Sequence, residues 1–214
     1  MMGVMVDVAV VDYGMGNLRS VEQALRKVAP AAKIVVTDDA DTIANASRVV
    51  FPGQGAMPDC MRELDARGLR DAVLLAARSK PFLGICIGLQ MLFEHSDEGN
   101  IAGLGILHGK VVRFASNMLD AQGNKLKVPH MGWNQVHHVQ HPLWNGIEQD
   151  ARFYFVHSYY VQTQDASLVQ ATSQYPQSFV CAVAKDNLFA VQFHPEKSQA
   201  DGLKLLQNFV QWNP

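Results

Sequence analysis

The clearest chemical pattern in the sequence surrounds Cys86. This cysteine follows a short apolar run and is flanked by Gly84 and Gly88, the spacing of a nucleophile elbow in which cysteine replaces serine. Glycines are needed because the nucleophile occupies a sharp turn where larger neighbours would collide with the strand or the helix. The helix start behind Cys86 would favour a thiolate and offer free backbone N–H groups to an oxyanion. We therefore predict that Cys86 is a nucleophile.

A thiol nucleophile needs a base, and His194 is the best placed of the eight histidines. It ends a strongly apolar run, and a second strand end can bring its imidazole beside the sulfur. Glu196 follows across Pro195, whose fixed φ holds the turn, so the carboxylate can accept from the imidazole and fix its tautomer. Without the elbow, His194 would more often be a hydrogen-bonded histidine at a strand end. The alternative for Cys86 is a core residue, which the spacing of its two glycines disfavours. Their joint occurrence favours a Cys–His–Glu triad.

A glycine-rich turn at residues 51–55 follows an earlier apolar run. It lacks the Lys and Ser/Thr of a phosphate-binding loop. We expect it to present a backbone N–H from Gly53 or Gln54 opposite the N–H of Ile87, so that two donors reach one oxyanion. Taken alone, the turn is also an ordinary connection between a strand and a helix.

The elements that would position these residues alternate through the first half of the chain. Apolar strand patterns occur at residues 4–11, 34–37, 49–51 and 82–85, and helical patterns at 18–29, 58–77 and 87–95. This βαβ order predicts a parallel sheet. Its strands are apolar nearly throughout, as expected when helices cover both faces.

The second half of the chain has shorter strand-like segments separated by turn residues. They lie at residues 105–114, 132–139, 153–156, 168–172, 179–184 and 188–193, with turns at 120–124 and 185–187, and an amphipathic helix follows at 199–212. These segments are typical of antiparallel hairpins. We predict one α/β domain over residues 1–214, with a central mixed, mostly parallel sheet flanked by helices in a flavodoxin-like arrangement, and antiparallel strands in its second half.

The composition limits the classes of function. The 214 residues carry 18 Lys and Arg against 20 Asp and Glu, so the chain lacks the basic excess of a nucleic-acid-binding protein. No apolar run approaches the roughly 18 to 20 residues of a membrane span, and the N-terminus has no basic region typical of a signal peptide. Three cysteines without CxxC spacing fit neither a disulfide framework nor a zinc site. We expect a cytoplasmic protein without metal, nucleic-acid partner or membrane partner.

The three motifs together resemble those of the class I, triad-type glutamine amidotransferases. PGQG comes first, then GICIGLQ, and HPE follows more than a hundred residues later. The resemblance implies that Cys86 attacks the amide carbon of glutamine, releasing ammonia and leaving a glutamyl thioester that water hydrolyses. It implies that His194 is the acid and base, that Glu196 orients it, and that no cofactor is needed. Gly53 and Ile87 are implied as the oxyanion donors.

The same resemblance assigns the residues that hold glutamine. Gln90 is implied to bind the substrate within the motif that contains the nucleophile. The backbone around His157, Ser158 and Tyr159 is implied to grip the α-amino acid end.

Further motifs resemble the glutaminase subunits of imidazole glycerol phosphate synthases. They lie at residues 12–20, 127–134 and 155–160, and the resemblance runs from residue 8 to the last helix. It implies a heterodimer with a cyclase subunit, a (β/α)8 barrel, contacted by Tyr13, Met15, Asn17, His130, Met131 and Trp133. From sequence patterns alone, Asn17 could equally cap the first helix and Trp133 could be a core aromatic.

In this family, ammonia passes through the core of the barrel. The cyclase uses it to convert a phosphoribulosyl formimino-carboxamide ribotide into imidazole glycerol phosphate and an aminoimidazole carboxamide ribotide. This chain has no phosphate-binding motif of its own, consistent with a phosphorylated substrate held by the partner.

Two alternatives differ from this hypothesis. One is a glutaminase subunit of another class I amidotransferase, for pyridoxal phosphate or anthranilate synthesis; the motifs at residues 13–17 and 129–134 argue against it. The other is a catalytically silent regulatory subunit, which would normally have lost a member of the triad.

Overall fold

The computed structural model describes residues 6–120 and 122–214. In the first half, its elements are β1 (Val8–Val11), α1 (Leu18–Val28), β2 (Ile34–Thr37), α2 (Ala40–Asn45), β3 (Arg48–Gly53), α3 (Met57–Ala66), α4 (Arg70–Ser79), β4 (Phe82–Cys86) and α5 (Ile87–Gln90). They are followed by β5 (Phe93–Ser96), β6 (Ile101–Ala102), β7 (Leu107–Arg113), β8 (His130–Gln135), β9 (His137–His138), β10 (Arg152–His157), β11 (Tyr159–Gln162), β12 (Val169–Gln174), β13 (Ser178–Lys185), β14 (Leu188–Val191) and α6 (Gln199–Gln211). Short 3-10 helices lie at η1 (Pro142–Trp144), η2 (Ala166–Leu168) and η3 (Pro195–Lys197).

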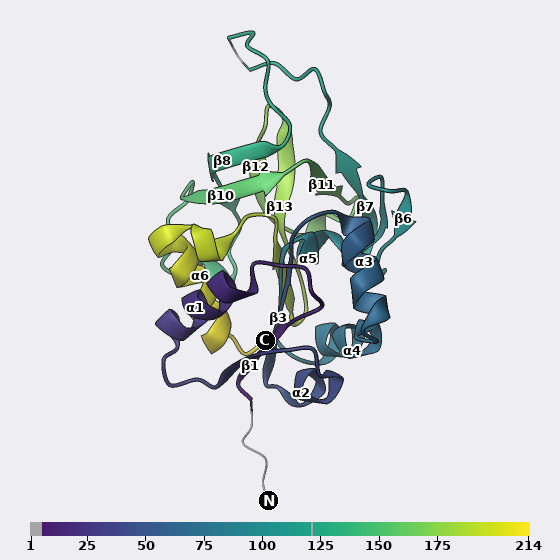
Figure 1. Ribbon diagram of the computed structural model, residues 1–214. Helices are drawn as coiled ribbons and strands as arrows, with labels where there is room; N and C mark the ends of the chain where they lie inside the picture. The colour runs from purple at the N-terminus through teal and green to yellow at the C-terminus, as the bar shows by residue number, and fades with distance from the viewer. Residues whose placement is uncertain (1–5, 121) are drawn as a thin grey trace, which may run out of the picture.

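A mixed sheet forms the centre of the molecule (Figure 1). Among the described residues it has twelve strands, and its parallel half runs in the order β2–β1–β3–β4–β14. Antiparallel pairs then join β14 to β13, β13 to β11, and β11 to β7. Every residue of β1, β4 and β14 is buried. The predicted α/β domain is confirmed, with parallel strands covered on both faces.

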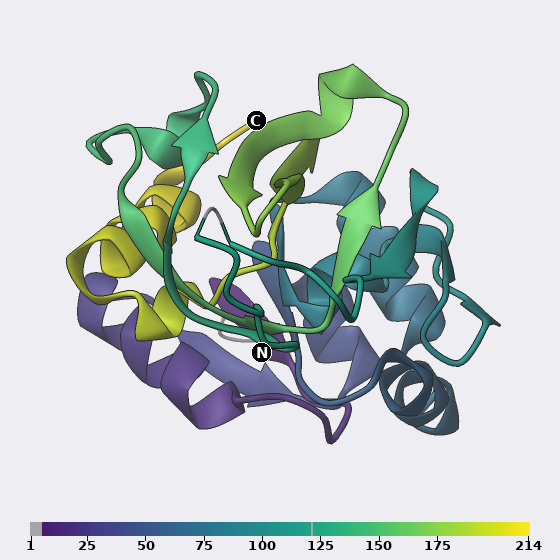
Figure 2. The ribbon, with the colours of Figure 1, turned by 90° about the horizontal axis from the view of Figure 1, so that it is seen from above.

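Helices cover the two faces of the sheet (Figures 1 and 2). α1 packs against α6 on one face, and α2 packs against α4 on the other. In α1, the buried residues Val21, Ala24 and Leu25 recur at helical spacing, so one stripe of the helix faces the core. This layering places the carboxyl ends of the parallel strands at one edge of the sheet, where such folds bind ligands.

Two helix predictions need correction, and one helix was missed. The helix predicted at residues 58–77 is two helices, because the chain turns at Gly68 with a φ of +66°. The helix predicted at 87–95 ends at Gln90, and β5 follows because it pairs with β7 and β6, a tertiary contact that overrides local spacing. α2 was not predicted; the Asp39 side chain caps it by accepting from the Thr42 N–H at 2.8 Å.

The antiparallel half also differs from a series of simple hairpins. The turn predicted at 185–187 is confirmed, since Lys185 pairs with Leu188 between β13 and β14. β8 and β10, however, form a separate two-stranded antiparallel sheet beside the end of the central sheet. The start of the strand predicted at 4–11 and residue 121 of the turn predicted at 120–124 lie outside the described residues.

Candidate active site

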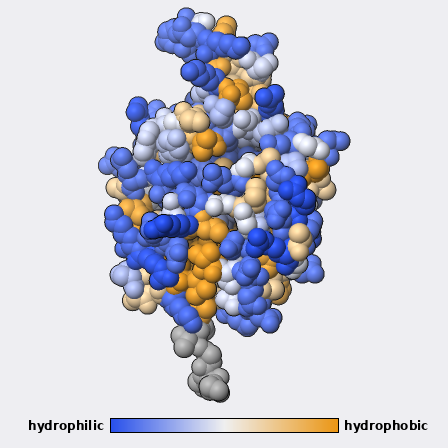
Figure 3. Space-filling view, in the orientation of Figure 1, coloured by the Kyte–Doolittle hydropathy of each residue, from blue (hydrophilic) through white to orange (hydrophobic). Residues whose placement is uncertain are grey.

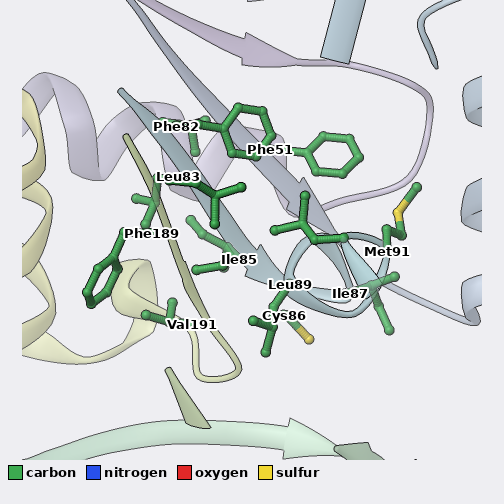
Figure 4. Close-up of a cluster of buried hydrophobic side chains, with 14 of the residues drawn as sticks. Phe51, Phe82, Leu83, Ile85, Cys86, Ile87, Leu89, Met91, Phe189 and Val191 are labelled. Carbon is green, nitrogen blue, oxygen red and sulfur yellow. The ribbon is translucent and has the colours of Figure 1, made fainter. Parts of the chain in front are cut away.

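Cys86 lies where β4 ends and α5 begins, at the carboxyl edge of the parallel strands. Its φ of 57° and ψ of −111° place a non-glycine residue in a strained backbone conformation. A Cβ on Gly88 would lie 1.9 Å from the Phe51 carbonyl oxygen, and one on Gly84 would lie 3.0 Å from Ala190 Cβ. The predicted strand–turn–helix geometry is therefore present. Gly88 is sterically required, and Gly84 lies where a side chain would be tightly packed. Figure 4 shows Cys86 at the edge of the apolar cluster around β3, β4 and β14.

A cavity of about 290 Å³ opens beside Cys86, a size suited to a small molecule. Its wall is formed by the ends of β4 and β10, the start of α5, the turn after β3 and the η3 region. The lining residues are Gln54, Gly55, Cys86, Ile87, Gln90, Glu98, Pro129, Val156, His157, Ser158, Tyr159, His194 and Lys197.

His194 meets Glu196 in the arrangement expected of a base and its orienting carboxylate. His194 Nδ1 lies 2.9 Å from Glu196 Oε1, and their side chains are only 3% and 1% exposed. The backbone of His194 is fixed by its N–H, which donates to the Tyr154 carbonyl at 2.9 Å, and by its carbonyl, which accepts from Ser198 Oγ at 2.6 Å. The other ring nitrogen of His194, Nε2, has no hydrogen-bond partner among the described residues. It is therefore available to interact with Cys86.

The charges around His194 favour its protonated form. Burial lowers its pKa, but the Cys86 thiolate and the Glu196 carboxylate outweigh burial and raise the pKa of His194 to about 10. The surroundings therefore favour an imidazolium at His194, and Glu196, 2.9 Å from Nδ1, stabilises its positive charge.

The other two cysteines occupy environments that suppress reactivity. Burial raises the pKa of Cys60 to about 11, and burial also raises the pKa of Cys181, which lies inside β13. We predict that iodoacetamide modifies Cys86 and spares Cys60 and Cys181 in the folded protein. Peptide mass spectrometry after brief treatment checks this; preferential labelling of Cys181 would show that the nucleophile has been misassigned.

The two expected oxyanion donors, Gly53 and Ile87, both lie next to Cys86, and a Cβ on Gly53 would come within 2.8 Å of Ile87 Cβ. Ile87 lines the cavity, whereas Gly53 pairs with Cys86 between β3 and β4 and lies outside the cavity wall. Gln54 and Gly55 line the cavity from that turn instead. The turn is anchored from behind, because the Tyr13 hydroxyl donates to the Pro52 carbonyl at 2.8 Å.

All the residues expected to hold the substrate are brought together. Gln90, His157, Ser158 and Tyr159 line the cavity. Gln90 Nε2 donates to the Tyr159 carbonyl at 3.1 Å, which joins α5 to β11 across the cavity wall. Gln90 Oε1 is buried and has no hydrogen-bond partner among the described residues, so it can accept from a ligand.

The expected interface residues divide by exposure. The side chains of Tyr13 and His130 are buried: Tyr13 packs on Phe51, and His130 is hydrogen-bonded to His157. Their place at an interface stays a prediction, which only their backbone could fulfil in this conformation. Met131 and Trp133 are 62% and 42% exposed, which excludes the alternative of a core tryptophan.

Met15 and Asn17 are half-buried. Asn17 does occupy the position before α1, but its side chain makes no capping hydrogen bond. Figure 3 shows a mainly hydrophilic face. Hydrophobic residues gather in a vertical stripe in the lower half of the view, and a smaller group lies at the base of the segment that projects between β7 and β8.

Three residues with polar side chains at the site were not predicted from the sequence. Glu98 and Lys197 line the cavity, and Gln192 places its Nε2 3.9 Å from Cys86 Sγ. Gln192 had a detectable signal, because it is a polar residue inside an otherwise apolar run and is fully buried. Glu98 and Lys197 lie in polar segments, where no pattern distinguishes them from surface charges.

Within residues 6–120 and 122–214, no cluster of three or more His, Cys, Asp or Glu side chains could hold a metal ion. In the same part of the chain, no helix has both the length and the hydropathy to cross a bilayer.

Comparison with known proteins yields a family match and similar chains. The model of the family "Glutamine amidotransferase class-I" matches residues 9–212. The chain is 67% identical over 211 residues to imidazole glycerol phosphate synthase subunit HisH of Thiobacillus denitrificans, covering 98% of this chain and 92% of that protein. It is 66% identical over 212 residues to the protein of the same name from Nitrosospira multiformis, covering 98% of this chain and 100% of that protein.

Solved structures show the same fold at lower identity. The structure of PurLQS from Thermotoga maritima includes a chain that aligns with a TM-score of 0.69 at 20% identity, covering 97% of this chain and 99% of that chain.

Proposed function

We propose that this chain is the glutaminase subunit of an imidazole glycerol phosphate synthase. The chain belongs to the class I glutamine amidotransferase family. The relatives named as subunits of such a synthase match nearly the full chain. The single observation that carries the chemistry is that Cys86, on a strained elbow, and His194 line one small cavity, with Glu196 hydrogen-bonded to His194.

The reaction begins with attack of the Cys86 thiolate on the side-chain amide carbon of glutamine. The carbonyl π electrons move to oxygen, and the resulting oxyanion accepts from the Ile87 N–H and from the turn that contains Gly53. The His194 imidazolium gives its proton to the amide nitrogen, the C–N bond breaks, and ammonia leaves. His194, now neutral, takes a proton from water, whose oxygen attacks the glutamyl thioester. Glutamate departs and the thiolate–imidazolium pair is restored.

The cavity wall suits a zwitterionic amino acid. It carries both a carboxylate, from Glu98, and an ammonium, from Lys197. Glu98 is held in place because its Oε2 accepts from the Met57 N–H at 2.8 Å, at the start of α3. With the acceptor Gln90 Oε1, these groups provide complementary partners for the charged and amide groups of glutamine.

The pH dependence of glutamine hydrolysis should reflect the raised pKa of His194. Since the pKa lies above its ordinary value of 6.5, the folded protein keeps this proton until the pH rises through about 10. The proton is needed for release of ammonia, so kcat/KM should stay level from about pH 7 to about pH 9 and fall above about 10. Initial rates of glutamate formation check this. A rate controlled by a group titrating near 6.5 would contradict the assigned charge state.

The partner proposed for this chain is a cyclase subunit with a (β/α)8 barrel. The exposed Met131 and Trp133 lie on β8, and Trp133 pairs with Tyr154 on the strand that also carries His157. Large apolar side chains of this kind serve as interface anchors. Direct transfer keeps ammonia out of bulk water, where protonation would remove its nucleophilicity.

Partner binding should activate the glutaminase. We expect the chain alone to hydrolyse glutamine slowly, and the cyclase with its ribotide ligand to raise the rate on the order of 100-fold, the upper part of the range for coupled sites. The physical reason is the glycine turn at Gly53 and Gly55, which can place one oxyanion donor only after docking. Coupled glutamate detection with and without the partner checks this.

The same activation measurement should be repeated with the synthase subunits of other pathways. Activation by the synthase subunits for pyridoxal phosphate or anthranilate, with none by the histidine-pathway cyclase, would favour the alternative functions. Full activity of the chain alone would show that no partner completes the site.

A further inference from the structure

A chain of buried hydrogen bonds runs from β8 to the nucleophile. Its members are buried or half-buried, and they belong to β8, β10, β11, α5 and the segment after β14. Two donors meet at the Tyr159 carbonyl, which accepts from His157 and from Gln90. The links are Asn134 Nδ2 to His130 Nε2 at 3.2 Å, His130 Nδ1 to His157 Nε2 at 3.0 Å, His157 Nδ1 to the Tyr159 carbonyl at 2.8 Å, Gln90 Nε2 to the same carbonyl at 3.1 Å and to Gln192 Oε1 at 3.0 Å, and Gln192 Nε2 to Cys86 Sγ at 3.9 Å.

The two histidines in this chain are neutral. Burial lowers the pKa of His130 to about 4 and that of His157 to about 3. Each imidazole therefore carries one N–H near neutral pH. A carbonyl oxygen can only accept, so the His157 proton must be on Nδ1. His157 Nε2 then accepts from His130 Nδ1, and His130 Nε2 accepts from the Asn134 amide.

The series of hydrogen bonds fixes which atom of its amide Gln90 presents to the cavity. Both hydrogens of Gln90 Nε2 are used, one by the Tyr159 carbonyl and one by Gln192 Oε1. A flipped amide would place Gln90 Oε1 against two acceptors. Gln90 must therefore present Oε1, its unpartnered buried acceptor, to the ligand. The same constraint leaves an N–H of Gln192 facing the Cys86 sulfur.

We propose that His130 is a positioning residue for glutamine binding, acting through His157 and the Tyr159 carbonyl on the Gln90 amide. This inference rests on the proposed glutaminase function. His130 does not line the cavity; it determines the tautomer of His157, which does. Without the His130 donor, the His157 proton can move to Nε2. The Tyr159 carbonyl then faces a lone pair, and the peptide that orients Gln90 loses its strongest contact.

The substitution His130→Leu tests this because it removes the donor while retaining bulk. We expect KM for glutamine to rise about tenfold, since one buried hydrogen bond is lost, with kcat within about twofold of the wild type. His130→Asn keeps an amide N–H near the position of Nδ1, and its KM should return to within about twofold of the wild type. Steady-state hydrolysis with saturating cyclase and ribotide ligand provides both constants.

A second variant tests the series of hydrogen bonds with a side chain of nearly the same size and shape. Asn134→Asp replaces the donor to His130 with an acceptor, and it also removes the hydrogen bond from Asn134 Nδ2 to the Gln174 carbonyl at 2.8 Å. At a pH where His130 stays neutral, its proton moves to Nε2 and a lone pair faces His157. We expect the same rise in KM for this variant, even if His130→Leu does not fold.

A matched control separates positioning from packing. Ser173→Ala removes a different hydrogen bond to β8, from the buried Ser173 Oγ to the Gln135 carbonyl at 2.7 Å. It leaves the hydrogen bonds between Asn134 and Cys86 unchanged. We expect it to lower the melting temperature without changing KM. Unchanged KM in Asn134→Asp and His130→Leu, or a KM for His130→Asn as high as that of His130→Leu, would overturn the positioning role alone. Absence of glutaminase activity in the wild-type complex would overturn the proposed function and this inference together.

Discussion

Replacing Cys86 with alanine should abolish glutamine hydrolysis, lowering kcat by a factor on the order of 10⁵ to 10⁶, as expected when a covalent nucleophile is removed. No thioester can form without the sulfur, and the other thiols cannot substitute for it. Cys60 and Cys181 are buried with raised pKa values, and neither lines the cavity. Glutamate release by the complex with the cyclase and its ligand is the measurement.

The same variant should keep its fold and its partner. Cys86 is 4% exposed at the cavity wall, and alanine retains the Cβ that the elbow accommodates. The Cys86→Ala complex should therefore still form product when ammonium salt is added in excess, because the cyclase needs only ammonia. Cys181→Ala is the matched control and should retain glutamine-dependent activity. Near wild-type hydrolysis by Cys86→Ala would refute the mechanism.

Replacing His194 with alanine should lower kcat by roughly 10³- to 10⁴-fold, near the upper end of the contribution of general acid–base catalysis. The imidazole both stabilises the thiolate and protonates the departing ammonia. Alkylation of Cys86 should also slow, because the thiolate loses its positively charged neighbour. Stopped-flow alkylation and steady-state hydrolysis measure the two effects separately.

Glu196→Gln is the matched variant for this prediction. Its amide oxygen can still accept from His194 Nδ1, so the ring stays oriented, but the negative charge that raises the pKa of His194 is lost. The alkaline fall in kcat/KM should therefore move to lower pH, with a smaller loss of kcat than in His194→Ala. A profile identical to the wild type would show that Glu196 does not set the protonation of His194.

The nucleophile and its helpers were predictable because their chemistry imposes local spacing. Gly84 and Gly88 must flank Cys86, since a Cβ at Gly88 would overlap the Phe51 carbonyl, and this requirement is visible in the sequence. The buried parallel strands were equally clear, because a short, continuous apolar run is typical of a strand that helices cover on both faces. Their order in the sheet is consistent with the βαβ pattern.

The remaining parts of the site depend on contacts between distant segments. Glu98 follows β5 and lines the cavity. β5 is placed by its pairing with β7 in the central sheet, and no local periodicity predicts that pairing. His130 was assigned to the interface because the family resemblance implies that the whole motif at residues 129–134, with Met131 and Trp133, faces the partner. Because successive side chains of a strand alternate, the strand that exposes them need not expose His130, which turns inward to His157.

The central claim is that this chain supplies ammonia from glutamine directly to a histidine-pathway cyclase. The most direct measurement combines the chain, the cyclase, the ribotide substrate and glutamine labelled with ¹⁵N in its side-chain amide, in the presence of excess unlabelled ammonium at a pH near 7. Mass spectrometry then measures the isotope content of the imidazole glycerol phosphate formed. The account predicts that most of the incorporated nitrogen is ¹⁵N and that Cys86→Ala removes this label. Product containing only unlabelled nitrogen, or label that persists in Cys86→Ala, would contradict it.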